Sequence, residues 1–224
     1  MLARMDPAEQ DRRREVNDAL RHDTRNWLGI GKGYATMLET LYDRLDPEQR
    51  RRALAGLVRT FDRLDAFVRG VLIDEQLETR TVTPLRAETT VESLLAPARA
   101  TYPEVAFEVE DATVPVDPVM VREIVDQLVR NAVTVGEPPV TVRVTGGGGC
   151  LRIEVHDAGE TIGADEVLFE RYATTAHSRA QRATGMGLGL SIVRRYAEAH
   201  GGHAGVRLAA SPGDGTTFWV ELPA

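Results

Sequence analysis

The sequence predicts an α+β protein in two parts, a helical hairpin followed by an α/β sandwich. Apolar side chains recur in alternating steps of four and three up to about residue 78, which is typical of two paired helices. Beyond residue 85, short strand patterns alternate with helical ones, as in an α/β sandwich. Residues 79–84 break the helical pattern. We therefore expect a helical domain over 1–78, a linker over 79–84 and a second domain over 85–224.

The helical part begins at Asp6-Pro7, where Asp is suited to the N-cap and Pro to the first helical position. A first helix is expected to end near Leu45, and a second begins at Asp46-Pro47. The first helix carries an apolar seam with one polar member: Val16, Leu20, Asp23, Trp27, Ile30, Tyr34, Met37 and Leu41. The second carries Leu54, Leu57, Phe61, Leu64, Val68 and Val71. One hairpin cannot bury both seams, so we expect a homodimer that forms a four-helix bundle.

The second part has the texture of interleaved strands and helices. Helical patterns cover residues 87–99, 118–133 and 187–199. Strand patterns cover residues 105–109, 114–116, 140–144, 151–155, 203–208 and 216–222, with a hairpin turn at 146–149. Residues 171–184 are small and polar without periodicity, and we expect them to form a mobile loop.

Composition excludes several classes of protein. The net charge of −7 and the lack of a basic stripe argue against a nucleic-acid partner. No apolar run approaches about 18 residues, so no membrane insertion is expected. The segment from Met1 to Arg14 is too polar for a signal peptide. The single cysteine, Cys150, excludes an internal disulfide and fits the reducing cytosol, which predicts a cytoplasmic protein.

The stretch Gly185-Met186-Gly187-Leu188-Gly189-Leu190 predicts a phosphate-binding loop. Alternate glycines let backbone N–H groups converge on an anion, and a helix that starts behind them adds the positive end of its dipole. It is no Walker A sequence, because no Lys-Ser/Thr follows, and no βαβ unit follows to make a dinucleotide fingerprint. Taken alone, the stretch is equally compatible with a tight turn.

Four further motifs accompany this stretch, in an order that resembles the catalytic half of sensor histidine kinases over about residues 8–224. They are Leu20-Arg21-His22-Asp23-Thr24-Arg25-Asn26-Trp27-Leu28, Gln127-Leu128-Val129-Arg130-Asn131-Ala132, Asp157-Ala158-Gly159 and Leu168-Phe169-Glu170-Arg171-Tyr172. The resemblance implies that the sandwich is a Bergerat-type (GHKL) ATP-binding domain. It also implies autophosphorylation with ATP and Mg²⁺, and transfer to an aspartate of a response-regulator receiver domain.

The first motif resembles the phosphoacceptor box of these kinases. A neutral imidazole such as His22 is a nucleophile near neutral pH, and the adjacent Asp23 could orient the ring through its other nitrogen. Asn26 lies at i+4 and shares the helix face of His22. The resemblance implies that Asn26 positions the water that hydrolyses the phosphorylated regulator. An exposed histidine on a polar helix face is the alternative explanation.

The other motifs imply an ATP site. By resemblance, Asn131 coordinates Mg²⁺ together with the phosphates, and Asp157 accepts a hydrogen bond from the adenine amino group beside Gly159. Phe169 packs under a lid. The phosphates are held by the loop that contains Gly185, Gly187, Leu188 and Gly189.

Three positions depart from the family. It usually has Asn at Gln127, a basic residue at Thr134 and Gly at Thr161. These departures favour an alternative, a histidine phosphotransfer hub with a degenerate ATPase domain. A non-catalytic dimeric scaffold is the second alternative. The sequence identifies neither the input signal, which could come from a separate sensor protein, nor the regulator.

Overall fold

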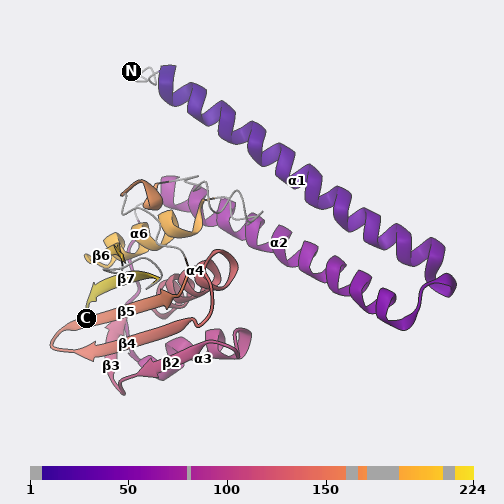
Figure 1. Cartoon of the computed structure of the whole chain (residues 1–224). Coiled ribbons are helices and arrows are strands. Elements are labelled where there is room, and N and C mark those ends of the chain that lie inside the picture. The colour runs from indigo at the N-terminus through magenta and orange to yellow at the C-terminus, as the bar shows by residue number, and fades with distance from the viewer. Residues whose placement is uncertain (1–6, 80–81, 160–165, 171–186, 209–214) are drawn as a thin grey trace. The chain divides into compact units, whose positions relative to one another are not determined.

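A computed structural model describes residues 7–79, 82–159, 166–170, 187–208 and 215–224 (Figure 1). The chain divides into two compact units, residues 1–71 and residues 72–224. In the described part of the chain, no helix is long and apolar enough to cross a membrane.

The first unit is the predicted helical hairpin. Helix α1 spans Pro7–Leu41, a short 3₁₀ helix η1 spans Tyr42–Arg44, and helix α2 starts at Pro47 and ends at Thr79, within the second unit. Asp46 and Gln49 form a reciprocal capping box: Asp46 Oδ1 accepts from the Gln49 N–H at 2.8 Å, and Gln49 Oε1 accepts from the Asp46 N–H at 3.0 Å. The predicted N-cap at Asp46 is therefore confirmed.

Glycines and aromatic rings alternate along the contact between α1 and α2. The rings of Trp27 and Phe67 meet edge to face with centroids 5.9 Å apart, and Trp27 is only 2% exposed. A Cβ at Gly31 would lie 3.3 Å from a Thr60 methyl carbon. Since the two backbones approach so closely here, the contact excludes bulkier side chains at this glycine.

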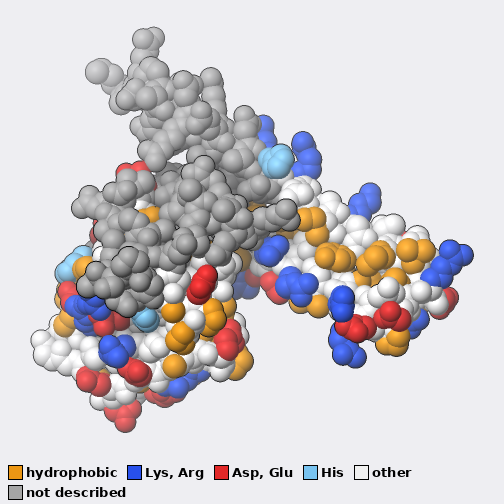
Figure 2. All heavy atoms as spheres, viewed as in Figure 1, with side chains coloured by type: hydrophobic (Ala, Val, Ile, Leu, Met, Phe, Trp, Pro, Cys, Tyr) orange, Lys and Arg blue, Asp and Glu red, His pale blue; other side chains and the backbone are white. Residues whose placement is uncertain are grey.

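The predicted heptad seam is therefore only partly the contact within one hairpin. Several of its largest members are 39–60% exposed: Ile30, Leu41, Leu54, Phe61 and Val68. Figure 2 shows hydrophobic side chains, in orange, along the hairpin of α1 and α2. One partner helix covers only part of each seam, so Trp27 is buried within the hairpin while these other seam residues remain on an outer apolar face.

The second unit contains two sheets. Strands β1 (Ala87–Thr90) and β3 (Thr113–Val116) form an antiparallel pair. The larger sheet has the order β2-β4-β5-β7-β6, in which β2 is parallel to β4 and all other neighbours are antiparallel. Its strands are β2 (Ala106–Val109), β4 (Thr141–Gly147), β5 (Cys150–Asp157), β6 (His203–Leu208) and β7 (Thr216–Pro223).

One prediction for this unit was wrong. Residues 87–90 form a strand, and the helix expected over 87–99 is α3 (Val91–Thr101), which begins after Thr90. Thr90 caps α3 through its side-chain oxygen, which accepts from the Ser93 N–H at 3.3 Å. The β1 residues pair with β3, a contact distant in sequence that no local pattern at 87–90 indicates.

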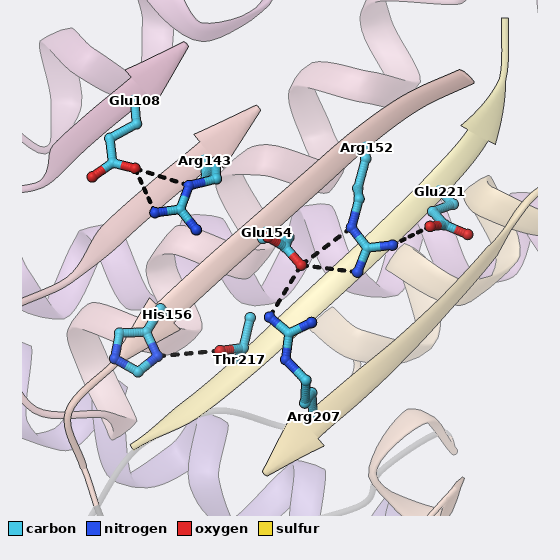
Figure 3. Close-up of polar contacts among 8 residues, drawn as sticks. All are labelled: Glu108, Arg143, Arg152, Glu154, His156, Arg207, Thr217 and Glu221. Carbon is cyan, nitrogen blue, oxygen red and sulfur yellow. Dashed lines mark hydrogen bonds and ion pairs between the residues drawn. The ribbon is translucent and has the colours of Figure 1, made fainter. Parts of the chain in front are cut away.

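Helices α3, α4 (Pro118–Val135) and α6 (Gly189–Ala199) cover one face of the larger sheet (Figure 1). Alternate residues of β5 enter this core, including Leu151, Ile153 and Val155 at 0–1% exposure. The opposite face carries ion pairs (Figure 3), among them Arg152 with Glu154 and Glu221. Although partial burial raises the pKa of Glu154, nearby guanidinium groups hold that pKa below its ordinary value.

A buried polar cluster joins the start of α4 to the end of α6. Asp117 Oδ1 accepts from the N–H groups of Val119 and Met120, at 2.9 and 3.2 Å, and Asp117 Oδ2 accepts from the Leu85 N–H at 2.8 Å. His200 Nε2 accepts from the Asp117 N–H at 3.2 Å. The Asp117 carboxylate therefore connects residue 85 to the start of α4, and the Asp117 N–H connects the same point to His200 at the end of α6.

We predict that Asp117→Ala lowers the free energy of unfolding by about 2–3 kcal/mol, because it removes a helix cap and leaves buried donors unpaired. Chemical denaturation of the full chain measures it. Asp111→Ala, at an exposed position between β2 and β3, is the matched control and should change stability by less than about 0.5 kcal/mol. Equal effects of the two substitutions would contradict the role of the cluster.

Candidate functional site

Three motifs that are far apart in the sequence meet around the second half of α4. Gly136, the C-cap of α4, lies against Asp157 at the end of β5, since a Cβ there would overlap the Asp157 carboxyl group. On the same helix, Gln127 contacts Gly189 at the start of α6. Asn131 lies between these two contacts, one turn beyond Gln127 and on the same helix face. Asp157, Asn131 and Gly189, three of the predicted site residues, therefore lie along the second half of α4.

Asp157 is buried, with 4% of its surface exposed. Its Oδ1 accepts from the Gly159 N–H at 3.0 Å, and the neighbouring Ala158 N–H donates to the Glu137 carbonyl at 2.9 Å. Burial raises the pKa of the Asp157 carboxyl above its ordinary value, while N–H donation from Gly159 and Glu137 acts in the opposite direction. Burial thus makes the ionised form of this carboxyl group less favourable than it would be in water.

The glycine stretch turns sharply before α6. Gly187 has a φ of +64°, in the left-handed region that favours glycine, and Leu188 is the N-cap residue of α6. Leu188 is 5% exposed, and its carbonyl accepts from the Ile192 N–H at 3.0 Å. The start of α6 therefore presents backbone N–H groups next to α4.

The other predicted site residues lie in the first unit or outside the described part of the chain. Gly185, like Thr161 and the expected loop over 171–184, lies outside the described residues. His22 and Asn26 belong to the first unit, where both side chains are exposed on α1. Asp23 lies on α1 between them, and its side chain is outside the described part. One turn separates His22 from Asn26, as predicted.

Phe169 lies in η2 (Glu166–Phe169) and is 4% exposed. Its ring meets that of Phe218 edge to face, with centroids 6.3 Å apart. The aromatic residue of the fourth motif is therefore part of the hydrophobic core.

Two residues at this site were not predicted from the sequence. Gly136 belongs to no motif, and only the structure shows that its missing side chain leaves room for Asp157. The second is Glu123, whose Oε1 accepts a hydrogen bond from Gln127 Nε2 at 2.6 Å. A signal for Glu123 did exist, because Glu123, Gln127 and Asn131 follow one another at i+4 and form a polar row on one helix face.

The chemistry of this row suits a hard cation. Asn131 and Gln127 carry amide oxygens, which are ligands of the kind that Mg²⁺ accepts, usually with several waters retained. No group of three or more His, Cys, Asp or Glu side chains suited to a metal occurs among the described residues. A metal at this edge would therefore depend on amide oxygens and on the ligand it accompanies.

Comparisons with known proteins agree on the kind of domain. Residues 116–224 match the family of histidine kinase-, DNA gyrase B-, and HSP90-like ATPases. The sensor protein CutS of Streptomyces coelicolor is 32% identical over 237 residues, covering 100% of this chain and 55% of CutS. The sensor protein KdpD of Mycobacterium tuberculosis is 28% identical over 228 residues, covering 95% of this chain and 26% of KdpD. The chain thus spans about a quarter to a half of these relatives.

Solved structures show the same fold. Full-length ShkA in complex with AMPPNP matches with a TM-score of 0.63 and 26% identity, covering 94% of this chain and 45% of ShkA. The histidine kinase ThkA in complex with the response regulator TrrA matches with a TM-score of 0.65 and 22% identity, covering 93% of this chain and 61% of ThkA. The predicted fold, a helical region followed by a GHKL-type domain, is confirmed.

The raised pKa of Asp157 gives a pH-dependent prediction. Burial favours the protonated form in the folded state, so the wild type loses stability as pH rises from the ordinary Asp value through the raised one. Asp157→Asn carries no charge and escapes this loss. We expect the unfolding free energy of Asp157→Asn, relative to wild type, to increase between about pH 3 and pH 7 in denaturant titrations. A difference that does not vary with pH would contradict this prediction.

Proposed function

We propose that this chain is an ATP-dependent protein-histidine kinase. The chain is a homologue of sensor histidine kinases, and its residues 116–224 match the histidine kinase-, DNA gyrase B-, and HSP90-like ATPase family. The observation that carries the proposal is the meeting of Asp157, Asn131 and the Gly187–Gly189 turn around α4. An adenine-binding carboxylate, an amide ligand and a row of backbone donors are the parts that a nucleoside triphosphate needs.

In this proposal each residue of the edge has one task. The Asp157 carboxylate accepts a hydrogen bond from the adenine amino group, next to Gly159. The turn around Gly185, Gly187, Leu188 and Gly189 donates backbone N–H groups to phosphate oxygens. Asn131 binds Mg²⁺ through its amide oxygen. The metal, when bound, neutralises negative charge on the phosphates.

The proposed reaction is phosphoryl transfer to His22. One ring nitrogen attacks the γ-phosphorus, an N–P bond forms, the bond between the γ-phosphorus and the bridging oxygen breaks, and ADP leaves with its electron pair. Asp23 receives the hydrogen bond of the other ring nitrogen and orients the imidazole. The exposed position of His22 on α1 supports this role, because a phosphoacceptor must be reachable.

The acceptor that we propose for the phosphoryl group is an aspartate on a response-regulator receiver domain. The neighbour ThkA was solved in complex with a response regulator, which supports this class of partner. We also propose that Asn26, one turn from His22, holds the water that hydrolyses the phosphorylated regulator. Asn26→Ala should then slow that hydrolysis more than autophosphorylation, and an equal loss of both activities would count against the role.

We propose a homodimer through the outer apolar face of the hairpin. Leu54, Phe61 and Val68 on α2 are 50–60% exposed within one chain, and Ile30 and Leu41 on α1 are 39–40% exposed. Burying such side chains against a second hairpin is favourable by about 25 cal/mol per Å² of apolar surface. A four-helix bundle would cover both seams, as the sequence predicts.

A histidine phosphotransfer hub that no longer uses ATP is the second candidate. Gln127 and Thr134, in place of the family's usual residues, favour it. Binding of AMPPNP to the chain separates the two candidates, since only a kinase needs the nucleotide. Phosphate exchange with a phosphorylated receiver domain then separates the hub from a non-catalytic scaffold.

We predict that the full chain, incubated with labelled ATP and Mg²⁺, gains phosphate that is labile in acid and stable in base, as expected of an N–P bond. His22→Gln should abolish the label, because it removes the nucleophile. Asn131→Asp should reduce labelling by at least about 100-fold by disturbing the metal site.

His203→Gln is the matched control for this assay. His203 is an exposed histidine that pairs with Glu221 on the open face of the sheet, away from the proposed site. It should label within about twofold of wild type. Label that survives His22→Gln would show that the phosphoacceptor has been misassigned, and a lack of AMPPNP binding at millimolar concentration would refute the kinase.

For assembly, we predict that Phe61→Glu converts a dimer into a monomer at micromolar concentration, because it puts a charge into the apolar interface. Sedimentation of the full chain measures this. Arg63→Glu, at an exposed polar position on the same helix, should remain dimeric. A monomeric wild type, or a dimeric Phe61→Glu, would contradict the proposed interface.

A further inference from the structure

The amide of Gln127 has one determined orientation. Its Nε2 lies 2.6 Å from Glu123 Oε1, one turn earlier on α4. An ionised carboxylate only accepts hydrogen bonds, so the NH₂ group of the amide must face Glu123 and the amide oxygen must face the opposite way. The orientation follows from chemistry and needs no further assumption about which amide atom is oxygen.

That oxygen faces the turn before α6. A Cβ added at Gly189 would lie 2.7 Å from Gln127 Oε1, so the oxygen lies directly against the glycine. Gln127 is 8% exposed. Among the hydrogen bonds of the described residues, Gln127 takes part only as the donor to Glu123, and its oxygen accepts none. An amide oxygen in this position can accept a hydrogen bond or bind a hard cation.

Glu123 is itself held between the two helices. It is partly buried on α4. Burial, followed by the charges of Glu123 and Asp117, raises the pKa of Tyr196 on α6, so the Glu123 carboxylate lies near that ring. With His200 against Asp117 and Gln127 against Gly189, the contacts run antiparallel along α4 and α6. The Glu123 carboxylate therefore lies on the side of α4 that faces α6, where it accepts from Gln127.

We propose that Glu123 is a positioning residue that holds the Gln127 amide so that its oxygen is presented to the metal at the Gly187–Gly189 turn. The inference rests on the proposed nucleotide site. Glutamine has one more rotatable bond than the asparagine usual in the family, and an untethered glutamine would lose rotamer entropy when it binds a ligand. The hydrogen bond to Glu123 removes that freedom in advance and makes the oxygen a better electron donor.

With this assignment Gln127 has a role at the site, although the family usually has Asn at this position. The hydrogen bond to Glu123, one turn earlier, holds the amide of this longer side chain against α4. Glu123, Gln127 and Asn131 then act as one row, in which the first member orients the second and the last two offer oxygens. The substitution at 127 and the carboxylate at 123 work as a pair.

The test is AMPPNP binding to the full chain by calorimetry, with Mg²⁺ and with EDTA. Glu123→Ala should weaken Mg²⁺-dependent binding about 10-fold, because loss of a residue that orients a ligand costs metal affinity in that range. Binding in EDTA should stay within about twofold, since the nucleotide's own contacts are unchanged. A merely structural role of Glu123 would weaken both equally.

Two further measurements complete the test. Asp126→Asn is the matched control, because it removes a carboxylate from α4 that interacts with Arg130 and Tyr102, whereas the Gln127 amide donates to Glu123. It should leave the ratio of the two affinities unchanged. In NMR spectra without nucleotide, Glu123→Ala should move the Gln127 side-chain NH₂ signals upfield, as expected when a hydrogen bond to a carboxylate is lost.

The outcomes distinguish this inference from the proposed function. If wild type binds AMPPNP and Glu123→Ala lowers both affinities equally, or neither, Glu123 is no positioning residue, while the ATP site stands. If the NH₂ signals do not move, the hydrogen bond is absent and the inference fails. If wild type binds no AMPPNP in either condition, the proposed function fails and takes this inference with it.

Discussion

The antiparallel contact between α4 and α6 is the constraint on which the candidate site depends. At one end, His200 accepts from the backbone of Asp117, which also caps α4 and holds residue 85. At the other end, the amide oxygen of Gln127 lies against Gly189. Because both ends are held, the start of α6 has a determined place beside α4. Any change in the spacing of these helices would separate the backbone donors from the amide oxygens.

The site also shows where the fold accepts a cost. Asp157 is buried although burial raises the pKa of its carboxyl, and the oxygen of Gln127 has no donor among the described residues. The opposite face of the sheet shows the contrast, because Arg152, Glu154 and Glu221 satisfy one another there (Figure 3). The carboxylate at the candidate site is thus held by backbone N–H donors, whereas the carboxylates of the opposite face are held by guanidinium groups.

The helical hairpin divides its apolar residues between two tasks. Trp27 and Phe67, with Gly31 against Thr60, close the contact within one chain. Phe61 and its exposed neighbours form a second face that this contact leaves uncovered. A heptad pattern alone does not distinguish these faces, because the steps of four and three describe both. Only the packing of the two helices decides which seam residues are buried within one chain.

The sequence by itself determined the α+β class, the hairpin, the glycine turn and most strands, because these depend on short-range periodicity, caps and glycine conformation. It also predicted Asn131, Asp157 and Leu188 as members of one site, through the order of their motifs. Tertiary structure alone decided that residues 87–90 pair with β3, that Gly136 leaves room for Asp157, and that Glu123 accepts a hydrogen bond from Gln127. Each of these results depends on residues brought together by packing, or on the direction of a side chain within that packing, and the spacing of residues along the sequence does not determine either.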